Sequence, residues 1–204
     1  MLQIKKIAIV WESETGGGVN NYLKYLLQSK AFEEKKITIF TNSENKGAKP
    51  LIKDFEKQKN INFVFFSSFF IFDRKRSFLE KSIYYFLKPF FLLLAIYRFK
   101  KILSNLKFDV LLCMSGGYGN FQSQQAAILA ADKSKISVRS IVMFHACVKP
   151  PLFMGFIFRI IHYFMAKTLT SLISVSKATE ETILDNSSLL NDQRLETKII
   201  YPGV

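Results

Sequence analysis

The sequence has few of the residues that build metal centres and disulfide frameworks. Among 204 residues there are two cysteines and two histidines, and Cys113 and Cys147 stand far apart, outside any CxxC spacing. A tetrahedral zinc site needs four ligands and a disulfide scaffold needs several cysteine pairs, so the sequence encodes neither. We therefore expect no metal and no bound cofactor, and the two thiols fit a reducing cytoplasm.

Long uncharged runs are also missing. The longest ones between positions 60 and 106 are residues 60–72 and 89–97, and both are shorter than the roughly 18 to 20 residues that span a bilayer. Near the N-terminus, the apolar run 7–11 is too short for the core of a signal peptide, and no small-residue cleavage site follows it. The sequence predicts neither a transmembrane helix nor a secretory signal.

Acidic residues are scarce relative to basic ones. The chain has 16 Asp and Glu against 29 Lys and Arg, which gives a formal charge of +13. Such an excess favours an anionic partner: a nucleic acid, a phospholipid or a phosphorylated small molecule. Nucleic acid is the weakest of the three, because the basic residues interleave with apolar runs such as residues 90–96 and no recognisable nucleic-acid-binding motif occurs.

What the chain does contain is mostly apolar. Hydrophobic residues make up 49% of it and 21 residues are phenylalanine, which excludes a disordered chain and supports one well-packed domain over residues 1–204. Short β-rich runs recur, most of them followed by a helical pattern, as is typical of buried strands in a parallel sheet. The runs are residues 6–11, 37–41, 61–66, 110–114, 140–145 and 172–175. We therefore predict a Rossmann-like α/β fold with helices on both faces of the sheet.

Apolar stripes at helical spacing predict two of the covering helices. The first is formed by Val19, Tyr22, Leu23, Leu26 and Leu27. The second is more apolar and is formed by Leu152, Phe153, Phe156, Ile157, Ile160, Ile161 and Phe164. Each stripe is expected to face the sheet.

Residues 69–105 are both aromatic and basic. A helix is predicted over residues 78–103 with Ser77 as its N-cap, and Pro89 should kink or divide it because proline removes a backbone hydrogen bond. The segment holds more large apolar residues than one core-facing stripe needs, which favours a helix lying on an anionic membrane surface at its cytoplasmic face. A buried core helix with solvated lysines is the alternative. The basic residues expected at the membrane include Arg74, Lys75, Arg76, Lys88 and Arg98.

Two glycine-rich loops follow predicted strands. Gly16, Gly17 and Gly18 come between residues 6–11 and the first helix, where close backbone approach and a helix N-terminus suit a phosphate. The pattern is neither GxGxxG nor a P-loop, so an ordinary surface turn is the alternative. The second loop follows residues 110–114 and is expected to line a ligand cleft, with a plain turn equally open. It contains Ser115, Gly116, Gly117 and Tyr118.

His145 is the leading catalytic candidate. It ends the predicted strand 140–145, so it would share one edge of the sheet with both glycine loops. An imidazole there suits proton transfer or hydrogen bonding to a hydroxyl acceptor, with a buried structural role as the alternative. His162 lies within an apolar helical pattern and is expected to pack in the interior or at a polar edge of its helix. Ser176 ends another predicted strand and is expected to cap the helix that follows.

Four segments, taken in order, resemble a known family. They are GGGVNNYLKYLL after the first strand, the strand ending in His145, ISVSKATEETIL, and the closing KIIYPGV. Together they resemble the N-terminal, acceptor-side domain of family 4 glycosyltransferases, which have the GT-B fold, over essentially the whole chain. The resemblance matches Ser176 to a serine that opens a helix after a buried strand. It matches Tyr201-Pro202-Gly203-Val204 to the approach to the linker, with Tyr201-Pro202 where asparagine is common.

The resemblance implies an enzyme and its substrates. It implies a retaining glycosyltransferase that moves a sugar from a nucleotide-sugar, a co-substrate, to a glycan or lipid-linked acceptor at the membrane. Gly17 and Gly18 would face the donor diphosphate, and His145 would lie near the acceptor hydroxyl. The family's donor-binding domain would follow Val204, so we expect a fragment or one half of a split enzyme, inactive alone. The alternative is a non-catalytic α/β module that recruits a partner to the membrane.

Overall fold

A computed structural model describes residues 4–13, 17–67, 78–115, 122–132, 135–145, 155–186 and 195–201. Within these ranges the chain forms a seven-stranded sheet in the order β3-β2-β1-β4-β5-β6-β7, with every neighbouring pair parallel. The strands are β1 (Lys6–Trp11), β2 (Lys36–Asn42), β3 (Ile61–Phe66), β4 (Val110–Ser115), β5 (Val138–Met143), β6 (Ser171–Ser174) and β7 (Glu196–Ile199). The helices are α1 (Gly18–Gln28), α2 (Lys30–Glu33), α3 (Ala48–Phe55), α4 (Phe78–Leu106), α5 (Gln122–Ala130), α6 (Gly155–Thr168) and α7 (Lys177–Asn186).

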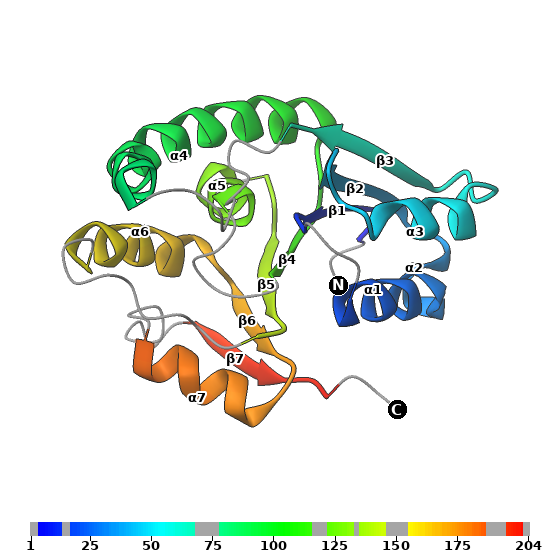
Figure 1. Ribbon diagram of the computed structural model, residues 1–204. Coiled ribbons are helices and arrows are strands. Elements are labelled where there is room, and N and C mark those ends of the chain that lie inside the picture. Colours follow the sequence, from blue (N-terminus) through cyan, green and yellow to red (C-terminus); the bar gives the residue numbers. More distant parts are fainter. Residues whose placement is uncertain are drawn as a thin grey trace.

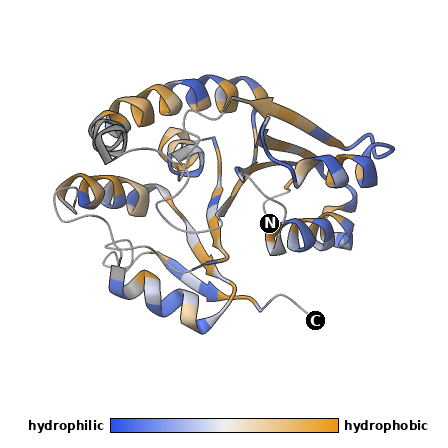
Figure 2. Cartoon of the chain, in the orientation of Figure 1, coloured by the Kyte–Doolittle hydropathy of each residue, from blue (hydrophilic) through white to orange (hydrophobic). Residues whose placement is uncertain are grey.

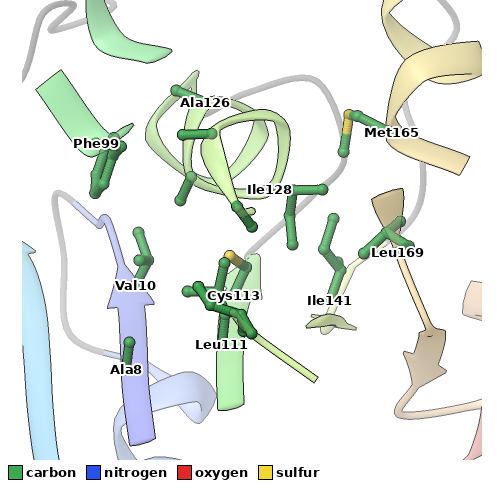
Figure 3. Close-up of a cluster of buried hydrophobic side chains, with 14 of the residues drawn as sticks. Ala8, Val10, Phe99, Leu111, Cys113, Ala126, Ile128, Ile141, Met165 and Leu169 are labelled. Carbon is green, nitrogen blue, oxygen red and sulfur yellow. The ribbon is translucent and has the colours of Figure 1, made fainter. Parts of the chain in front are cut away.

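The helices form one layer on each face of the sheet (Figure 1). α1, α2 and α3 pack on one face, and α4, α5, α6 and α7 pack on the other. Successive side chains of a strand point to opposite faces, so Ile9 of β1 belongs to the hydrophobic cluster that includes Leu23 of α1, whereas Val10 belongs to the one that includes Phe99 of α4 and Met165 of α6. Figure 3 shows this second cluster, in which α5 lies between α4, α6 and the sheet.

The predicted parallel α/β architecture is confirmed, and five of the predicted strands lie within one residue of β1, β2, β3, β4 and β6. One strand is shifted. β5 ends at Met143, so His145 lies two residues beyond the strand instead of closing it. β7 was not predicted, because its four residues, ETKI, form a short edge strand whose first three side chains are exposed.

α4 begins at the predicted residue, Phe78, but ends at Leu106, three residues later than predicted, and of the two expected effects of Pro89 it does not show a division. It is one helix with Pro89 inside it, and Figure 1 shows its first turns set at an angle to the rest. A kink is the expected result of the hydrogen bond that proline removes. Ser77, the predicted N-cap, lies outside the described residues. The inner stripe of α4 is buried and consists of Leu92, Ala95, Phe99 and Leu103.

α6 turns a different face to the core from the one that the sequence predicts. Its fully buried positions include Phe158, His162, Met165 and Ala166. Three residues of the predicted core stripe are instead exposed, namely Phe156, Ile160 and Phe164. Because the helix is apolar on both faces, helical spacing alone did not distinguish the stripe that packs on the sheet.

The described helices do not include a membrane span. None of them is both long enough and apolar enough to cross a bilayer. α4 has sufficient length, but its second half contains Arg98, Lys100 and Lys101. This agrees with the expectation that residues 89–97 are too short an uncharged run.

Candidate functional site

All the strands are parallel, so their carboxyl ends meet at one edge of the sheet. Ligands of open α/β sheets bind at that edge, at the point where the strand order reverses. In this chain the reversal falls between β1 and β4, whose following helices, α1 and α5, lie on opposite faces. The edge therefore brings together the N-terminus of α1, Ser115 at the end of β4, His145 after β5 and Ser176 after β6.

No described residue crowds the N-terminus of α1. Gly17 is the N-cap residue and has no side chain with which to cap the helix, and Gly18 is the first helical residue. A Cβ atom at either position would meet no described residue within 4 Å, and Gly17 has a φ of −177°, an extended value that any residue adopts. Neither backbone conformation nor crowding therefore requires glycine here. Uncapped N–H groups at an open helix end are suited to binding an anion.

Asparagine side chains hold the segments on either side of the glycine loop. Oδ1 of Asn42, at the end of β2, accepts a hydrogen bond from the Ser13 N–H at 3.0 Å. Beyond the loop, Nδ2 of Asn20 donates to the Gly47 carbonyl at 3.1 Å. Oδ1 of Asn45 accepts from the Gly47 N–H at 3.0 Å. Asn42 and Asn45 are both buried, so this network fixes where α1 begins relative to β1 and β2.

Sequence reasoning missed a buried carboxylate at this edge. Glu12 directly follows β1 and is 6% exposed. Its Oε2 accepts hydrogen bonds from the Ser123 hydroxyl and, at 3.4 Å, from the Ser123 N–H in the first turn of α5. A negative acceptor is favourable at a helix N-terminus. The acid after the strand is visible in the sequence, but its partner lies 111 residues away, so no local pattern reveals the pair.

His145 is exposed just beyond β5. Phe144, the residue before it, donates its N–H to the Ser115 carbonyl at 3.0 Å, and its ring meets Tyr22 of α1 edge-on with 5.1 Å between ring centroids. Tyr22 lies about one turn after Gly18. Burial raises the pKa of the Tyr22 phenol, so this side chain is neutral at physiological pH. The ring contact ties the glycine end of α1 to the strand end that carries His145.

Ser176 and His162 have the structural roles that the sequence predicts. Oγ of Ser176 accepts the N–H of Thr179 at 3.1 Å and so caps α7. His162 is a buried residue of α6, and its ring centroid lies 5.9 Å from that of Phe158. Burial lowers the pKa of His162 to about 4, because an apolar surrounding disfavours the charged imidazolium. His162 is therefore a neutral core residue at physiological pH.

Several predicted site residues lie outside the described residues. They are Gly16, Gly116, Gly117, Tyr118, Arg74, Lys75 and Arg76, together with the side chain of Lys88. Ser115 is buried and Arg98 is exposed on α4. Within the described part of the chain, no group of three or more His, Cys, Asp or Glu side chains could hold a metal ion.

Comparison with known proteins places the fold. No protein-family profile and no curated protein matches the sequence, but solved structures do. A glycosyltransferase from Rickettsia africae is similar with a TM-score of 0.58 and 16% identity, over 100% of this chain and 44% of that one. The lipopolysaccharide outer core galactosyltransferase WaaB is similar with a TM-score of 0.52 and 17% identity, over 98% of this chain and 46% of WaaB. LpCGTa, solved in complex with UDP, has a TM-score of 0.54 and 11% identity, over 99% of this chain and 53% of LpCGTa.

These similarities concern the fold. The parallel sheet with its two helical layers is a Rossmann-like half-domain of the kind found in GT-B glycosyltransferases and in related epimerases. The half-domain expected from the sequence is thereby confirmed. The chain spans about half the length of the structures that it matches.

Proposed function

We propose that this chain is the acceptor-binding half of a retaining glycosyltransferase, corresponding to the N-terminal domain of a family 4 enzyme. The enzyme would move a sugar from a nucleotide-sugar to a membrane-associated glycan or lipid acceptor. The supporting observation is the contact between Tyr22 and Phe144, which sets the open N-terminus of α1 beside the strand end that bears His145. An anion-binding helix end and an exposed imidazole at one sheet edge suit transfer from a diphosphate to a hydroxyl.

Each part of the edge has a proposed chemical role. The N–H groups at Gly16, Gly17 and Gly18 would bind the donor diphosphate, whose charge grows as the sugar leaves. Transfer breaks the bond between the anomeric carbon and the diphosphate oxygen and forms a new bond to the acceptor oxygen. His145 would orient the acceptor hydroxyl or take up its proton. The acceptor side of the cleft would be lined by Ser115, Gly116, Gly117, Tyr118 and Ser176.

The proposed substrates and location follow from the neighbours and from the charge of the chain. LpCGTa was solved with UDP, which supports a nucleotide-sugar donor. WaaB is a lipopolysaccharide galactosyltransferase, which supports an envelope acceptor. The basic aromatic residues 69–105, with a chain charge of +13, would hold the domain at the anionic cytoplasmic face of the membrane. The residues expected to contact it are Arg74, Lys75, Arg76, Lys88 and Arg98.

A reconstitution experiment tests the proposal. We expect purified residues 1–204 to fold but to transfer no sugar from a panel of nucleotide-sugars to membrane lipid extracts, because in this proposal the described edge forms one wall of a two-domain cleft. Adding a donor-binding domain should restore transfer, and His145→Ala should abolish most of the restored rate. Turnover by residues 1–204 alone would contradict the assignment of this chain as half of a cleft.

The alternative is a non-catalytic α/β module that recruits a partner to the membrane. It is favoured by the exposed aromatic residues of α4, where Phe90 is 65% and Tyr97 is 68% exposed beside Arg98. The two functions differ in what accompanies the chain. If an adjacent reading frame encodes a second Rossmann-like domain with paired acidic residues, the enzyme is supported. If the chain binds anionic vesicles and no such second domain accompanies it, the recruiting module is supported.

A further inference from the structure

α6 carries an exposed apolar stripe on the side opposite its core contacts. Phe156 is 73%, Tyr163 55%, Phe164 53% and Ile160 42% exposed. These positions recur at three- and four-residue intervals, so they form one continuous face of the helix. Large apolar side chains gathered in this way mark an interaction surface more often than a solvated one.

The charged side chains of α6 itself are basic. Arg159 and Lys167 are exposed on the same helix, and the sequence has no Asp or Glu between Asp132 and Glu180. The Lys167 ammonium lies 4.1 Å from the centre of the Tyr163 ring and donates a hydrogen bond to the Tyr163 hydroxyl. Aromatic rings with a cation at their polar end are suited to the boundary between lipid and water.

α4 presents a similar face in the same helical layer. Phe90 and Leu93 are each 65% exposed, and the basic Lys100 and Lys101 follow them. Both helices flank α5, and Figure 2 shows α6 and much of α4 as hydrophobic, whereas α1 and α3 carry more hydrophilic residues. α6 therefore exposes the same combination of large apolar and basic side chains as residues 69–105, although the two segments are far apart in the sequence.

We propose that α6 is a second membrane-contacting helix. Phe156, Ile160, Tyr163 and Phe164 would enter the interface of an anionic bilayer, and Arg159 and Lys167 would contact lipid phosphates. The inference rests on the membrane association within the proposed function, and adds an element outside residues 69–105. A bilayer satisfies the apolar and the basic groups together, whereas a symmetric contact between two copies would set cations against cations.

Tryptophan placed on α6 tests the contact directly. The single natural tryptophan, Trp11, is 1% exposed and buried in the core, so a new one reports its own surroundings. With vesicles of phosphatidylcholine and phosphatidylglycerol, Phe156→Trp emission should shift to the blue and be quenched by brominated lipid. The matched control is Tyr25→Trp on α1, where Tyr25 is 68% exposed, and its emission should not change.

The outcomes separate α6 from the rest of the proposed function. If the natural chain sediments with the vesicles but Phe156→Trp emission is unchanged, the α6 inference is overturned while membrane association stands. If the natural chain does not bind these vesicles, membrane association itself fails. Binding that is equal on neutral vesicles and insensitive to salt overturns the assignment to anionic lipid.

A loss-of-binding variant gives an independent measurement. The double change Phe156→Ser and Tyr163→Ser should weaken vesicle binding about tenfold or more, because two large apolar groups no longer leave water. The thermal midpoint should hold, since both side chains are exposed. Tyr25→Ser is the control and should bind as the natural chain does. A chain that is dimeric without lipid and becomes monomeric in the double variant would show that α6 is a self-association surface, which contradicts the proposal.

Discussion

The two helical layers of the sheet expose different chemistry. On the α1–α3 side, charges of both signs are exposed, and Lys24 of α1 pairs with Asp54 of α3 at 2.7 Å between Nζ and Oδ2. On the α4–α6 side, the exposed stripes of α4 and α6 contain aromatic and aliphatic residues, and the described charged residues beside them are basic, such as Arg159 beside Phe156. The acidic residues exposed on the described helices of this layer, Glu181 and Asp185, lie on α7. Both layers bury similar apolar stripes against the same strands.

The difference between the layers corresponds to the two roles proposed for the chain. The α1–α3 layer is an ordinary solvated surface, and its α1 helix presents Gly17 and Gly18 to the strand ends where the candidate site lies. The α4–α6 layer retains a second apolar face that the core does not use. A stripe that faces solvent costs free energy in an isolated domain, so its presence on two helices of one layer is the ground for the proposed membrane contact.

Two phenylalanines on α4 give the largest expected contrast. Phe99 is 3% exposed and meets Phe66 edge-on at 5.7 Å, whereas Phe90 is exposed. Phe99→Ala should lower the free energy of unfolding by about 3–5 kcal/mol, and Phe90→Ala should change it by about 0.5 kcal/mol or less. Denaturant titration measures both. If both variants lose the same free energy of unfolding, the outer stripe of α4 is packed within the folded chain. The proposed difference between the two helical layers would then be wrong.

Acid should destabilise the α4–α6 layer through His162. Its folded pKa of about 4 lies below the ordinary value of 6.5, so between these pH values the unfolded chain binds a proton that the folded chain excludes. Stability is then complete above pH 6.5 and falls as the pH drops towards 4, by up to about 3 kcal/mol. His162→Leu should flatten this part of the curve when the unfolding free energy is measured from pH 7 to pH 4. An unchanged slope in the variant would assign the acid sensitivity to other groups.

The exposed histidine should behave in the opposite way. In an enzyme that includes the donor half, His145→Ala should lower kcat about 100-fold or more if the imidazole handles a proton or positions the reacting groups. The thermal midpoint should change little, because the side chain is exposed. Both quantities are measured on the same preparation, with His162→Leu as the matched histidine control. A lowered thermal midpoint with normal turnover per folded molecule would show that His145 is structural and does not belong to the active site.

Substitutions of two glycines that begin helices in opposite layers should have the smallest effect on stability, and they test the proposed diphosphate site. Gly18 starts α1 and Gly155 starts α6, and a Cβ at either would have no neighbour within 4 Å in the part of the chain that the structure describes. Alanine at each should leave stability unchanged or raise it by up to about 0.5–1 kcal/mol, because alanine loses less backbone freedom on folding. Only Gly18→Ala should raise KM for the nucleotide-sugar, since its methyl group fills space proposed for the diphosphate. Equal KM values for both variants would place the donor elsewhere.

The sequence specified the sheet more completely than the site. Buried parallel strands are recognisable because both of their faces are apolar, which is why β1 and β3 were predicted with their observed bounds. α5 has no apolar stripe to detect, because neighbours surround it and small residues such as Ala126 and Ala127 fill its faces. The face of α6 was misassigned for the converse reason, since both of its faces are apolar.

The site depends on pairs that are distant in the sequence. Position after a strand predicted the edge shared by Gly17, Gly18 and His145, because parallel strands end together. It could not predict that Ser123 donates to Glu12 or that Phe144 packs on Tyr22. Such contacts follow from how far each strand end projects and how each helix is set on the sheet, which local periodicity does not encode.

The position of β1 inside the sheet, between β2 and β4, has a consequence for synthesis on the ribosome. Ile7 lies opposite Ile37 on one side and Val110 on the other, so one neighbour is translated about 30 residues later and the second about 100 residues later. At roughly 5–20 residues per second, the β4 side of β1 stays unpaired for about 5–20 s. α4 emerges during that interval, before the strand that completes its packing surface. An open strand edge and a helix with two apolar faces then coexist on the nascent chain, a stage in which chaperone capture or early contact with the membrane competes with aggregation.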